Sequence, residues 1–431
     1  MARKMKDSGI EWIGEIPEGW EIHRIKTHFS IISGSGFKPE LQGQSTGDFP
    51  VCKASDISSS GHYLLTSANY ITSDIVKSQH FSIIPKGSIL FAKIGEAMRK
   101  NNRSLCSLDC CVDNNCQGLV PKNISSEFSY YLFTCIDMTW FDNAGTIPCI
   151  NNQKLYDCRI PFPSYGEQTL IANHLNIQCA KINEMLFHIR SSIEEYKKLK
   201  QTVITQAVTK GVRGEREMKD SGVEWIGKIP REFDPVQLKF FCKLITDGTH
   251  FSPTTVENGW PYITAGDVHG IGLDYNSAKR ISEEDFQLLV AQGCQPLKGD
   301  VLLVKDGATT GRVGFVDSDT PCVILSSVAM LRPADNTDGH YLMYLLASDF
   351  LQKQILVSMA GSAMPRTTLT KLTKYIGLLP PLHEQKEIAN YLDAKCAEID
   401  KLIAKKEQLV KELESYKKSL IYEVVTGKRE V

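Results

Sequence analysis

Two polar and basic stretches carry the side chains best suited to contact a nucleic acid. They span 93–103 and 305–312, and each follows an apolar run and so comes directly after an expected strand. Lysine and arginine neutralise phosphates, whereas amide and hydroxyl groups hydrogen-bond to base edges. The candidate DNA-binding residues here are Lys93, Arg99, Lys100, Asn101, Arg103, Lys305, Thr309 and Arg312. A solvated hairpin turn is the alternative for any single residue, but matching positions in both stretches favour a shared role.

Two shorter segments add four candidates. Thr249 and His250 follow an Asp-Gly step at 247–248, and Arg366 and Thr367 follow a proline. For the His250 side chain, packing or turn capping is the more common role, with base or phosphate contact as the alternative. Lysine pairs within 197–200 and 405–418 could contact phosphates, but a solvated helix face explains them better.

The sequence lacks the patterns that DNA-processing enzymes need. Residues 307–312 lack the lysine and the spacing of a phosphate-binding loop. An amino-methyltransferase would show an Asn/Asp-Pro-Pro-aromatic run, and a metal-dependent nuclease would show clustered acids, but Asp300 stands alone near Lys305. The cysteines between 106 and 116 have no CxxC step and no nearby histidine, which favours core packing over zinc. We therefore expect no catalytic centre, no metal and no cofactor in this chain.

Composition sets broad limits. The 431 residues are 42% hydrophobic, which is enough for the cores of two or three domains. A net charge of -1 excludes a histone-like polycation but not a DNA binder, because affinity depends on local patches. The N-terminal stretch has no apolar signal core, and no window is long enough to span a membrane. With 13 scattered cysteines, we expect a soluble, cytoplasmic protein with free, mostly buried thiols.

An internal repeat determines the expected architecture. Residues 5–17 return as 218–230, with 11 of 13 positions identical. A Glu-Gln step also repeats, at Glu167-Gln168 and Glu384-Gln385, and the same offset of 217 residues carries Cys179 onto Cys396. Between these anchors the halves diverge, apart from short echoes such as 86–90 with 298–302 and 144–145 with 360–361. A retained frame around a diverged middle suggests two targets held in one geometry, and neutral drift after duplication is the alternative.

The segments after the Glu-Gln steps have the periodicity of long coiled-coil helices. The first follows a Ser-x-x-Glu capping box at 164–167 and stops near Gly211, and the second follows two prolines and stops near Gly427. The expected seam residues are Ile171, Leu175, Ile182, Met185, Ile189, Tyr196, Leu199, Val203, Ile388, Leu392, Ile399, Leu402, Leu409, Leu413, Tyr416 and Leu420. Ile193, Ile403 and Val410 fall off this seam and would leave area for partners. An antiparallel pair is the simplest arrangement, and helices that recruit other subunits are the rival.

The diverged middles have the composition of α/β domains. Strands are predicted at 51–57, 83–94, 262–268 and 301–304, where β-branched and aromatic residues are bounded by glycine, proline and aspartate. Short helices are predicted at 130–135 and 340–348. The fold class is therefore α/β, with two globular domains separated by two long helices and related as an internal pseudo-twofold repeat.

Together, the repeated Lys-Asp-Ser-Gly-Ile/Val-Glu-Trp-Ile-Gly run and the twice-occurring Pro-x-x-x-Glu-Gln step closely resemble the specificity subunit of Type I restriction-modification enzymes. The resemblance spans the whole chain. It implies two target-recognition domains, at 1–163 and 214–380, and two conserved helical spacers, at 164–213 and 381–431. It also implies a non-catalytic subunit that binds double-stranded DNA.

The resemblance further implies two modification subunits, which bind S-adenosylmethionine and methylate adenine, and restriction subunits that use ATP and magnesium. A pseudo-symmetric reader with two different domains would recognise a bipartite, asymmetric site with one half-site per domain. The rival from another class is a protein-protein scaffold that reads no DNA. A self-contained methyltransferase is the third interpretation, which the missing motifs disfavour.

Overall fold

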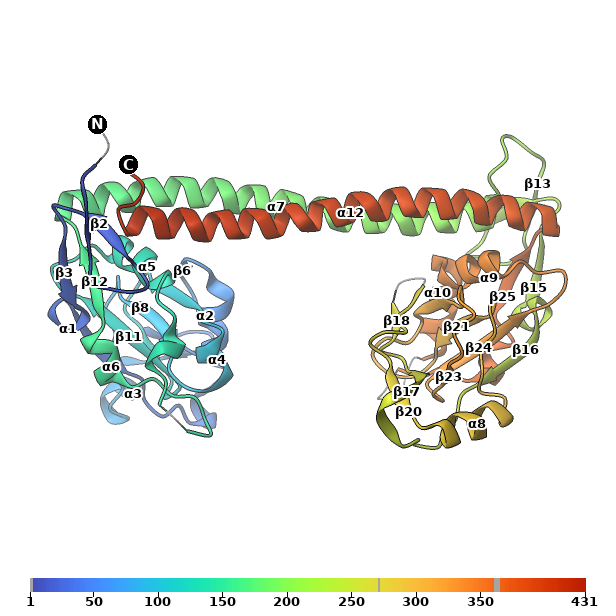
Figure 1. Cartoon of the computed structure of the whole chain (residues 1–431), viewed down its shortest axis with the longest axis horizontal. Coiled ribbons are helices and arrows are strands. Elements are labelled where there is room, and N and C mark those ends of the chain that lie inside the picture. The colour runs from blue at the N-terminus through green and yellow to red at the C-terminus, as the bar shows by residue number, and fades with distance from the viewer. Residues whose placement is uncertain (1–2, 144, 270–271, 360–364) are drawn as a thin grey trace. The chain divides into compact units, whose positions relative to one another are not determined.

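The computed structural model describes residues 3–143, 145–269, 272–359 and 365–431 (Figure 1). Packing divides the chain into two compact units, one made of Met1–Ile189 with Gln408–Val431 and the other of Arg190–Glu407. Each unit contains one α/β module and one end of each of two long helices. The boundaries predicted from the sequence, at 1–163, 164–213, 214–380 and 381–431, divide the chain in sequence order and stay a prediction.

The two long helices begin and end where the sequence signals predict. Helix α7 spans Tyr165–Lys210 and α12 spans Leu382–Val425. At the start of α7 the Glu167 amide donates to Ser164 Oγ (3.3 Å), and the Ser164 amide donates to Glu167 Oε2 (3.2 Å), which confirms the capping box. Gly211 and Gly427 follow the helices with φ of +73°, a conformation that side chains other than hydrogen disfavour.

The helices pair antiparallel within each unit. In the second unit Lys200 Nζ lies 2.7 Å from Asp400 Oδ2, and Arg213 Nη2 lies 2.8 Å from Glu387 Oε1. Residue numbers therefore rise along α7 while they fall along α12. In the first unit Lys417 Nζ donates to Asn183 Oδ1 (2.7 Å), in the same sense. The predicted antiparallel coiled coil is confirmed.

The predicted seam is right at both ends and wrong in the middle. Met185, Leu199, Leu409 and Tyr416 are exposed, whereas Leu186 and Ile193 are buried. The cause is the pair of repeated cysteines. Cys179 and Cys396 are buried and occupy seam positions. The predicted heptad instead placed their polar neighbours Gln178 and Lys395 on the seam, as interruptions, and so lost the register. Ile193, Ile403 and Val410, which were expected to lie off the seam, are buried or half-buried on it.

In the first module the main sheet has the order β4-β11-β8-β9-β6, and a smaller sheet has the order β10-β5-β7 (Figure 1). The strands of the two sheets are β4 (Phe29–Ser33), β5 (Phe49–Cys52), β6 (Tyr63–Leu64), β7 (Tyr70–Ile71), β8 (Ile89–Ala92), β9 (Arg103–Cys106), β10 (Cys111–Val112) and β11 (Cys116–Pro121). The pair β3 (Glu21–Arg24) and β12 (Arg159–Phe162) joins the start of the module to its end. The helices are α1 (Ile25–His28), α2 (Ala54–Ser60), α3 (Ser73–Ser78), α4 (Gly95–Arg99), α5 (Ser126–Thr134) and α6 (Asn152–Asp157), with 3-10 turns η1 (Pro39–Leu41) and η2 (Met138–Phe141).

The second module repeats this topology, except that its main sheet has four strands instead of five and that β18 and β19 pair in a sheet of their own. Its main sheet has the order β16-β24-β21-β22 and its smaller sheet the order β20-β17-β23, with parallel pairing of β17 to β23 as of β5 to β10. The strands are β15 (Asp234–Gln237), β16 (Cys242–Asp247), β17 (Thr255–Ile263), β18 (Val268–His269), β19 (Gly272–Leu273), β20 (Lys279–Ile281), β21 (Val301–Val304), β22 (Val313–Phe315), β23 (Val323–Ile324), β24 (Val328–Pro333) and β25 (Ile376–Leu379). The helices are η3 (Leu238–Phe241), α8 (Glu283–Ala291), α9 (Gly339–Ala347), α10 (Asp349–Ser358) and α11 (Leu369–Leu372). Two middles with almost no sequence identity therefore share one fold.

The short predicted elements are partly right. The strand at 301–304 and the helices around 130 and 340 are present, as β21, α5 and α9. Only the start of 51–57 is a strand, because Asp56 Oδ2 accepts the Lys53 amide (2.8 Å) and begins α2. Within 83–94 the strand starts at Ile89, since Gly87 makes a turn with φ of +82°. β17 begins before residue 262 and ends at Ile263.

The repeated Glu-Gln step attaches each module to its helix. Gln168 Oε1 accepts the Ser125 amide (2.8 Å), and Gln168 Nε2 donates to the Pro163 carbonyl (2.9 Å). Gln385 makes the matching bonds to the Asp338 amide (2.8 Å) and the Pro380 carbonyl (2.8 Å). Ser125 and Asp338 are the N-caps of α5 and α9. In each module, one buried carboxamide near the start of the long helix thus bonds both to the segment that leads into that helix and to the N-cap of a module helix.

The thiols lie largely in the cores, as predicted. All 13 cysteines are free and most are buried. Cys106, Cys110 and Cys116 line one apolar cluster with Cys52, and burial raises the pKa of the neighbouring Cys111 to about 11. Among the described residues, no helix has the combination of length and apolar composition that a membrane span requires.

Candidate nucleic-acid interface

The two candidate loops occupy the same place in the two modules. The first, 93–102, connects β8 to β9, and the second, 305–312, connects β21 to β22. β8 lies between β11 and β9, as β21 lies between β24 and β22. The correspondence expected from position alone is confirmed by topology.

In the second module, all three segments that carry candidate residues come together. The Thr367 amide donates to the Lys305 carbonyl (2.9 Å), and the Gly307 amide donates to the Pro365 carbonyl (3.0 Å). The strand that leads to Thr249 joins the same cluster, because Asp247 Oδ2 lies 3.2 Å from Lys305 Nζ. Segments 247–250, 305–312 and 365–367 therefore form one surface, which we call the second loop cluster.

A chain of alternating charges runs through this cluster. Lys305 Nζ lies 3.2 Å from Asp247 Oδ2 and 3.0 Å from Asp306 Oδ2, and Arg366 Nε lies 3.0 Å from Asp306 Oδ1. The Lys305 side chain is 4% exposed, so it holds the loops together and does not offer a free cation to a ligand. This corrects its prediction as a surface contact. With two carboxylates and two cations, the chain is electrically balanced and is a poor cradle for phosphate.

The remaining candidates of the second loop cluster divide into exposed and buried groups. His250, Arg312 and Arg366 are exposed, and Thr309 is half-buried. Thr249 is buried, and its Oγ1 accepts the Phe251 amide (2.9 Å). Thr367 is also buried, with its Oγ1 at 2.6 Å from the Tyr375 hydroxyl. Both threonines support loops from within, which corrects their prediction as direct contacts.

The first module presents cations on and beside a short helix. Within the predicted loop, residues 95–99 form α4, which leaves Arg99 and Lys100 exposed and Lys93 half-buried. Arg99 Nη1 lies 2.7 Å from Glu96 Oε1, an exposed pair that binding could rearrange at little cost.

Arg103 and Asn101 have internal roles. The Arg103 guanidinium is buried and donates to the Asn101 and Ile136 carbonyls. Burial lowers its pKa to about 10. Asn101 has φ of +61°, and its Oδ1 accepts from Arg103 Nη2 (2.9 Å) and from the Met138 amide (3.0 Å). Both side chains fix the turn that leads into β9. Arg103 is therefore not available on the surface as predicted, whereas Asn101 is half-buried.

The sequence analysis missed one segment, which lies in the first module next to the candidate loop. The Gly95 amide donates to the Pro148 carbonyl (2.8 Å), and Ile94 forms an antiparallel bridge with Cys149. The bridge between Asp306 and Arg366 is its counterpart, so the segment around Cys149 corresponds to the segment around Arg366. The Ala-Gly step at 144–145, repeated at 360–361, was the sequence pattern that could have indicated this segment. Residues 144, 360 and 361 lie outside the described part of the chain. Exposed Phe251, which directly follows the 247–250 segment of the second loop cluster, was missed as well.

A glycine marks the same crossing in both modules. A Cβ on Gly34 would lie 1.9 Å from the Asp113 carbonyl oxygen, and one on Gly248 would lie 1.9 Å from the Ile324 carbonyl oxygen. Only glycine allows the strand end to pass so close to the neighbouring backbone. The following residues, Ser35 and Thr249, then form matching parallel bridges to Asp113 and Leu325. The loops after the main sheet are thereby placed in the same way in both modules.

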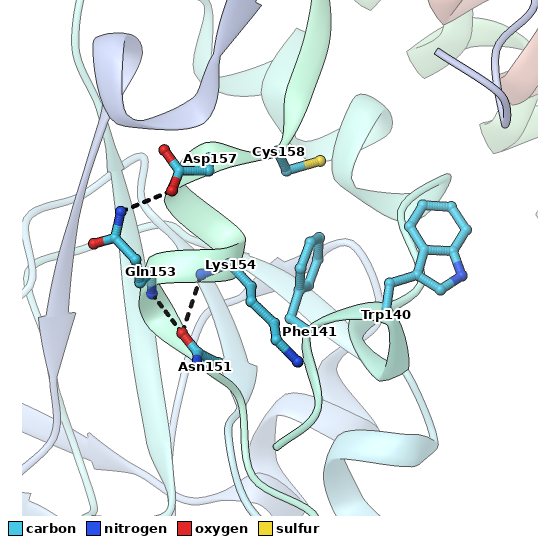
Figure 2. A pocket seen from close by; sticks show the side chains of 7 residues that line it. All are labelled: Trp140, Phe141, Asn151, Gln153, Lys154, Asp157 and Cys158. Atoms are coloured by element: carbon cyan, nitrogen blue, oxygen red, sulfur yellow. Dashed lines mark hydrogen bonds between the residues drawn. The ribbon is translucent and has the colours of Figure 1, made fainter. Parts of the chain in front are cut away.

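An open depression of the first module is a weaker candidate for a ligand site. Figure 2 shows its lining residues, Trp140, Phe141, Asn151, Gln153, Lys154, Asp157 and Cys158. Its polar groups are engaged within the fold: Gln153 Nε2 donates to Asp157 Oδ2 (2.8 Å), and Asn151 Oδ1 accepts two amides at the start of α6. Lys154 Nζ donates to the Asp142 carbonyl (2.9 Å). The depression therefore lacks a convergent set of free polar groups.

Comparison with known proteins agrees with this architecture. The family model described as the Type I restriction modification DNA specificity domain matches residues 17–195 and again 230–412. The MjaVIII specificity subunit of Methanocaldococcus jannaschii is 26% identical, over 96% of this chain and 93% of the relative. The EcoKI specificity subunit of Escherichia coli is 21% identical, over 90% of this chain and 84% of the relative.

A solved structure supports the fold. A chain from a study of complex assembly and conformational transition of the type I R-M system aligns with a TM-score of 0.69 at 18% identity, and the alignment covers 96% of this chain and 99% of that one. The duplicated family match, the shared module topology and the antiparallel helices lead to one conclusion. The chain belongs to the family of non-catalytic DNA specificity subunits of Type I restriction-modification systems.

Proposed function

We propose that each module reads one half of a bipartite, asymmetric double-stranded DNA site through its loop cluster. One observation carries this proposal: the modules share topology and loop placement, but present different exposed side chains. The first module offers exposed Arg99 and Lys100 beside half-buried Lys93. The second offers exposed His250, Arg312 and Arg366. The same geometry with different chemistry is what two unlike half-sites require.

The candidate loops of the two modules are suited to different contacts with phosphates and bases. In the first module Arg99 pairs with Glu96, and no ion pair of Lys93 or Lys100 is found among the described residues. These cations suit phosphates and base edges together. In the second, Arg366 is held by Asp306 within a balanced group of charges, which suits a neutral base edge better than a phosphate. A guanidinium offers paired donors, and guanine presents two acceptors in the major groove.

The chemistry of modification belongs to other subunits in this proposal. The chain works in the cytoplasm with two modification subunits, which carry S-adenosylmethionine and methylate adenine, and with restriction subunits that use ATP and magnesium. The folded helices supply a scaffold for that assembly.

The test is to co-express the chain with its modification subunit and to map methyladenine across the host genome by single-molecule sequencing. We expect a split, asymmetric motif that disappears when this chain is omitted. Lys100→Ala should weaken one half of the motif and Arg312→Ala the other. A stable complex with no sequence motif would contradict the proposal and favour the scaffold function.

A further inference from the structure

The repeated 13-residue runs fold into two equivalent hairpins. The first pairs β1 (Met5–Asp7) with β2 (Glu15–Pro17), and the second pairs β13 (Met218–Asp220) with β14 (Lys228–Pro230). They belong to different compact units, so each can be described by itself. Their tips, 8–14 and 221–227, differ only at Ile10 and Val223. The fold explains some of these identities and not others.

Most of the identical positions have a structural role. The Gly9 amide donates to Asp7 Oδ1 (2.9 Å), as the Gly222 amide does to Asp220 Oδ1 (2.9 Å). The buried serines each accept an amide two residues on, at 3.1 Å in both hairpins. Ile16 and Ile229 are fully buried in the two main cores. These residues are retained because the hairpin needs them.

At the tips themselves, two adjacent positions have no such explanation. Glu11 and Glu224 are exposed, and across the described residues no hydrogen bond or ion pair engages either carboxylate. Trp225 is 59% exposed, which is unusual for the largest apolar side chain. Trp12 is half-buried, with its ring centroid 5.7 Å from that of Trp140, which is itself 46% exposed. The Glu-Trp pair is therefore identical in both tips although the fold does not require it in the second.

Exposed neighbours in the same hairpins did not stay identical. Glu15 corresponds to Lys228, and Glu18 corresponds to Arg231, so the charge reverses at both positions. All four residues are exposed. These two surface positions thus diverged between the copies, whereas the Glu-Trp pair did not. Recent duplication alone would have preserved all of them.

We propose that the tips Glu11-Trp12 and Glu224-Trp225 are two equivalent docking sites for the two modification subunits. The inference rests on the proposed function for the identity of the partner. Identical tips fit one protein bound twice, whereas the two different DNA half-sites would need different surfaces. An exposed glutamate repels phosphates and selects a basic partner surface. Tryptophan is the side chain most often dominant in protein interfaces.

The first tip is held rigidly, as a docking site should be. Tyr422 Oη donates to the carbonyl oxygens of Trp12 (3.0 Å) and Ile13 (3.1 Å), which fastens the tip to the end of α12. The glycines at the hairpin bends, Gly9 and Gly14, have φ of +64° and +72°, close to those of Gly222 and Gly227. A fixed backbone reduces the ordering cost of association.

The test uses Trp225→Ala and Trp12→Ala, alone and together, in the full chain co-purified with its modification subunit. Phe240→Ala is the matched control, because Phe240 is 57% exposed in the same unit and is not repeated. Native mass spectrometry should show two modification subunits with the unaltered chain and the control. Each single variant should retain one, with affinity at the altered tip at least tenfold weaker, about the loss expected for a dominant interface residue, and the double variant should retain none.

Glu11→Lys and Glu224→Lys provide a second arm that cannot create a core defect, because both side chains are exposed. They should reproduce the loss, and swapping a basic residue of the partner to an acid should restore binding. Variants that keep two modification subunits, or that lose only restriction subunits, would overturn the inference while leaving the proposed function intact. An unaltered chain that binds no modification subunit would overturn the proposed function itself.

Discussion

Arg366 Nε lies 3.0 Å from Asp306 Oδ1, and the backbones of the two residues also form an antiparallel bridge. The Arg366 side chain is nevertheless 59% exposed. A carboxylate therefore pairs with the guanidinium on one side, while more than half of the side chain faces solvent. This arrangement reduces the number of conformations that the arginine must give up when it binds a planar partner.

Asp306→Asn should relax base selection by the second module. Without the carboxylate, Arg366 can still contact DNA, but its orientation is no longer fixed. We expect discrimination at one base pair of one half-site to fall by about 1 to 3 kcal/mol, the range for a lost bidentate contact. Methylome mapping of the co-expressed complex measures this as new sites that differ from the parent motif at that position.

The matched comparison for that experiment is Arg366→Lys, which keeps the charge and removes the planar fork. It should relax the same base pair. If both variants weaken methylation at all sites equally, Arg366 is a phosphate contact and the base-reading assignment is wrong.

Lys305→Met should destabilise the second module. The substitution leaves Asp247 and Asp306 close together without the buried cation between them. We expect a loss of roughly 3 kcal/mol in the free energy of unfolding, as for breaking a buried ion pair. Denaturant unfolding measures it, and Lys298→Met is the control, because Lys298 and its partner Asp319 are both exposed. Normal stability of Lys305→Met together with altered base selection would instead indicate that Lys305 contacts DNA.

Gln385→Ala should loosen the attachment of α12 to the second module. It removes bonds to the Asp338 amide and the Pro380 carbonyl and leaves both without that partner. A cost of about 2 kcal/mol is expected. Gln408→Ala on the same helix removes only an exposed bond to Glu412 and should have no measurable effect. Equal stabilities of the two variants would show that the Glu-Gln step has a purpose other than attachment.

Acidification should destabilise the first module through His28. Burial, followed by the charge of His23, lowers the His28 pKa below its usual value near 6.5. The unfolded chain then binds a proton that the folded chain resists, so this contribution is complete above about pH 6.5 and is lost as the pH falls through the lowered pKa. His28→Phe keeps the ring that stacks on Phe162 at 4.0 Å, and Phe241 occupies the matching place in the second module. Unfolding at pH 7.5 and pH 5.5 should show a smaller difference for His28→Phe than for the unaltered chain.

The internal repeat made the architecture predictable from the sequence. The candidate site was less predictable, because its charged side chains pair with residues that are distant in the sequence. Gln168 and Gln385 could be found because the same chemistry occurs twice at one spacing. Lys305, by contrast, looks like a surface cation until Asp247, far away in the chain, is brought to its ammonium group. The prediction that Arg103 lies on the surface was wrong for a similar reason, because one of its acceptors is the carbonyl of Ile136, which is distant in the sequence. A loop's position follows from local patterns, whereas the burial of its charges depends on partners that sequence spacing does not reveal.

The contact between Tyr422 and the first hairpin has a consequence for how such chains can be assembled. The end of α12 packs with Ile13 and Trp20, and the end of α7 packs with Ile229 and Phe233. Each helix end therefore supports the hairpin that begins the other copy, and the connectivity is that of a closed ring cut at one place. A chain circularly permuted to start at the second hairpin would keep every one of these contacts. By the same logic, two identical half-length chains carrying one module each would complete each other and read a palindrome.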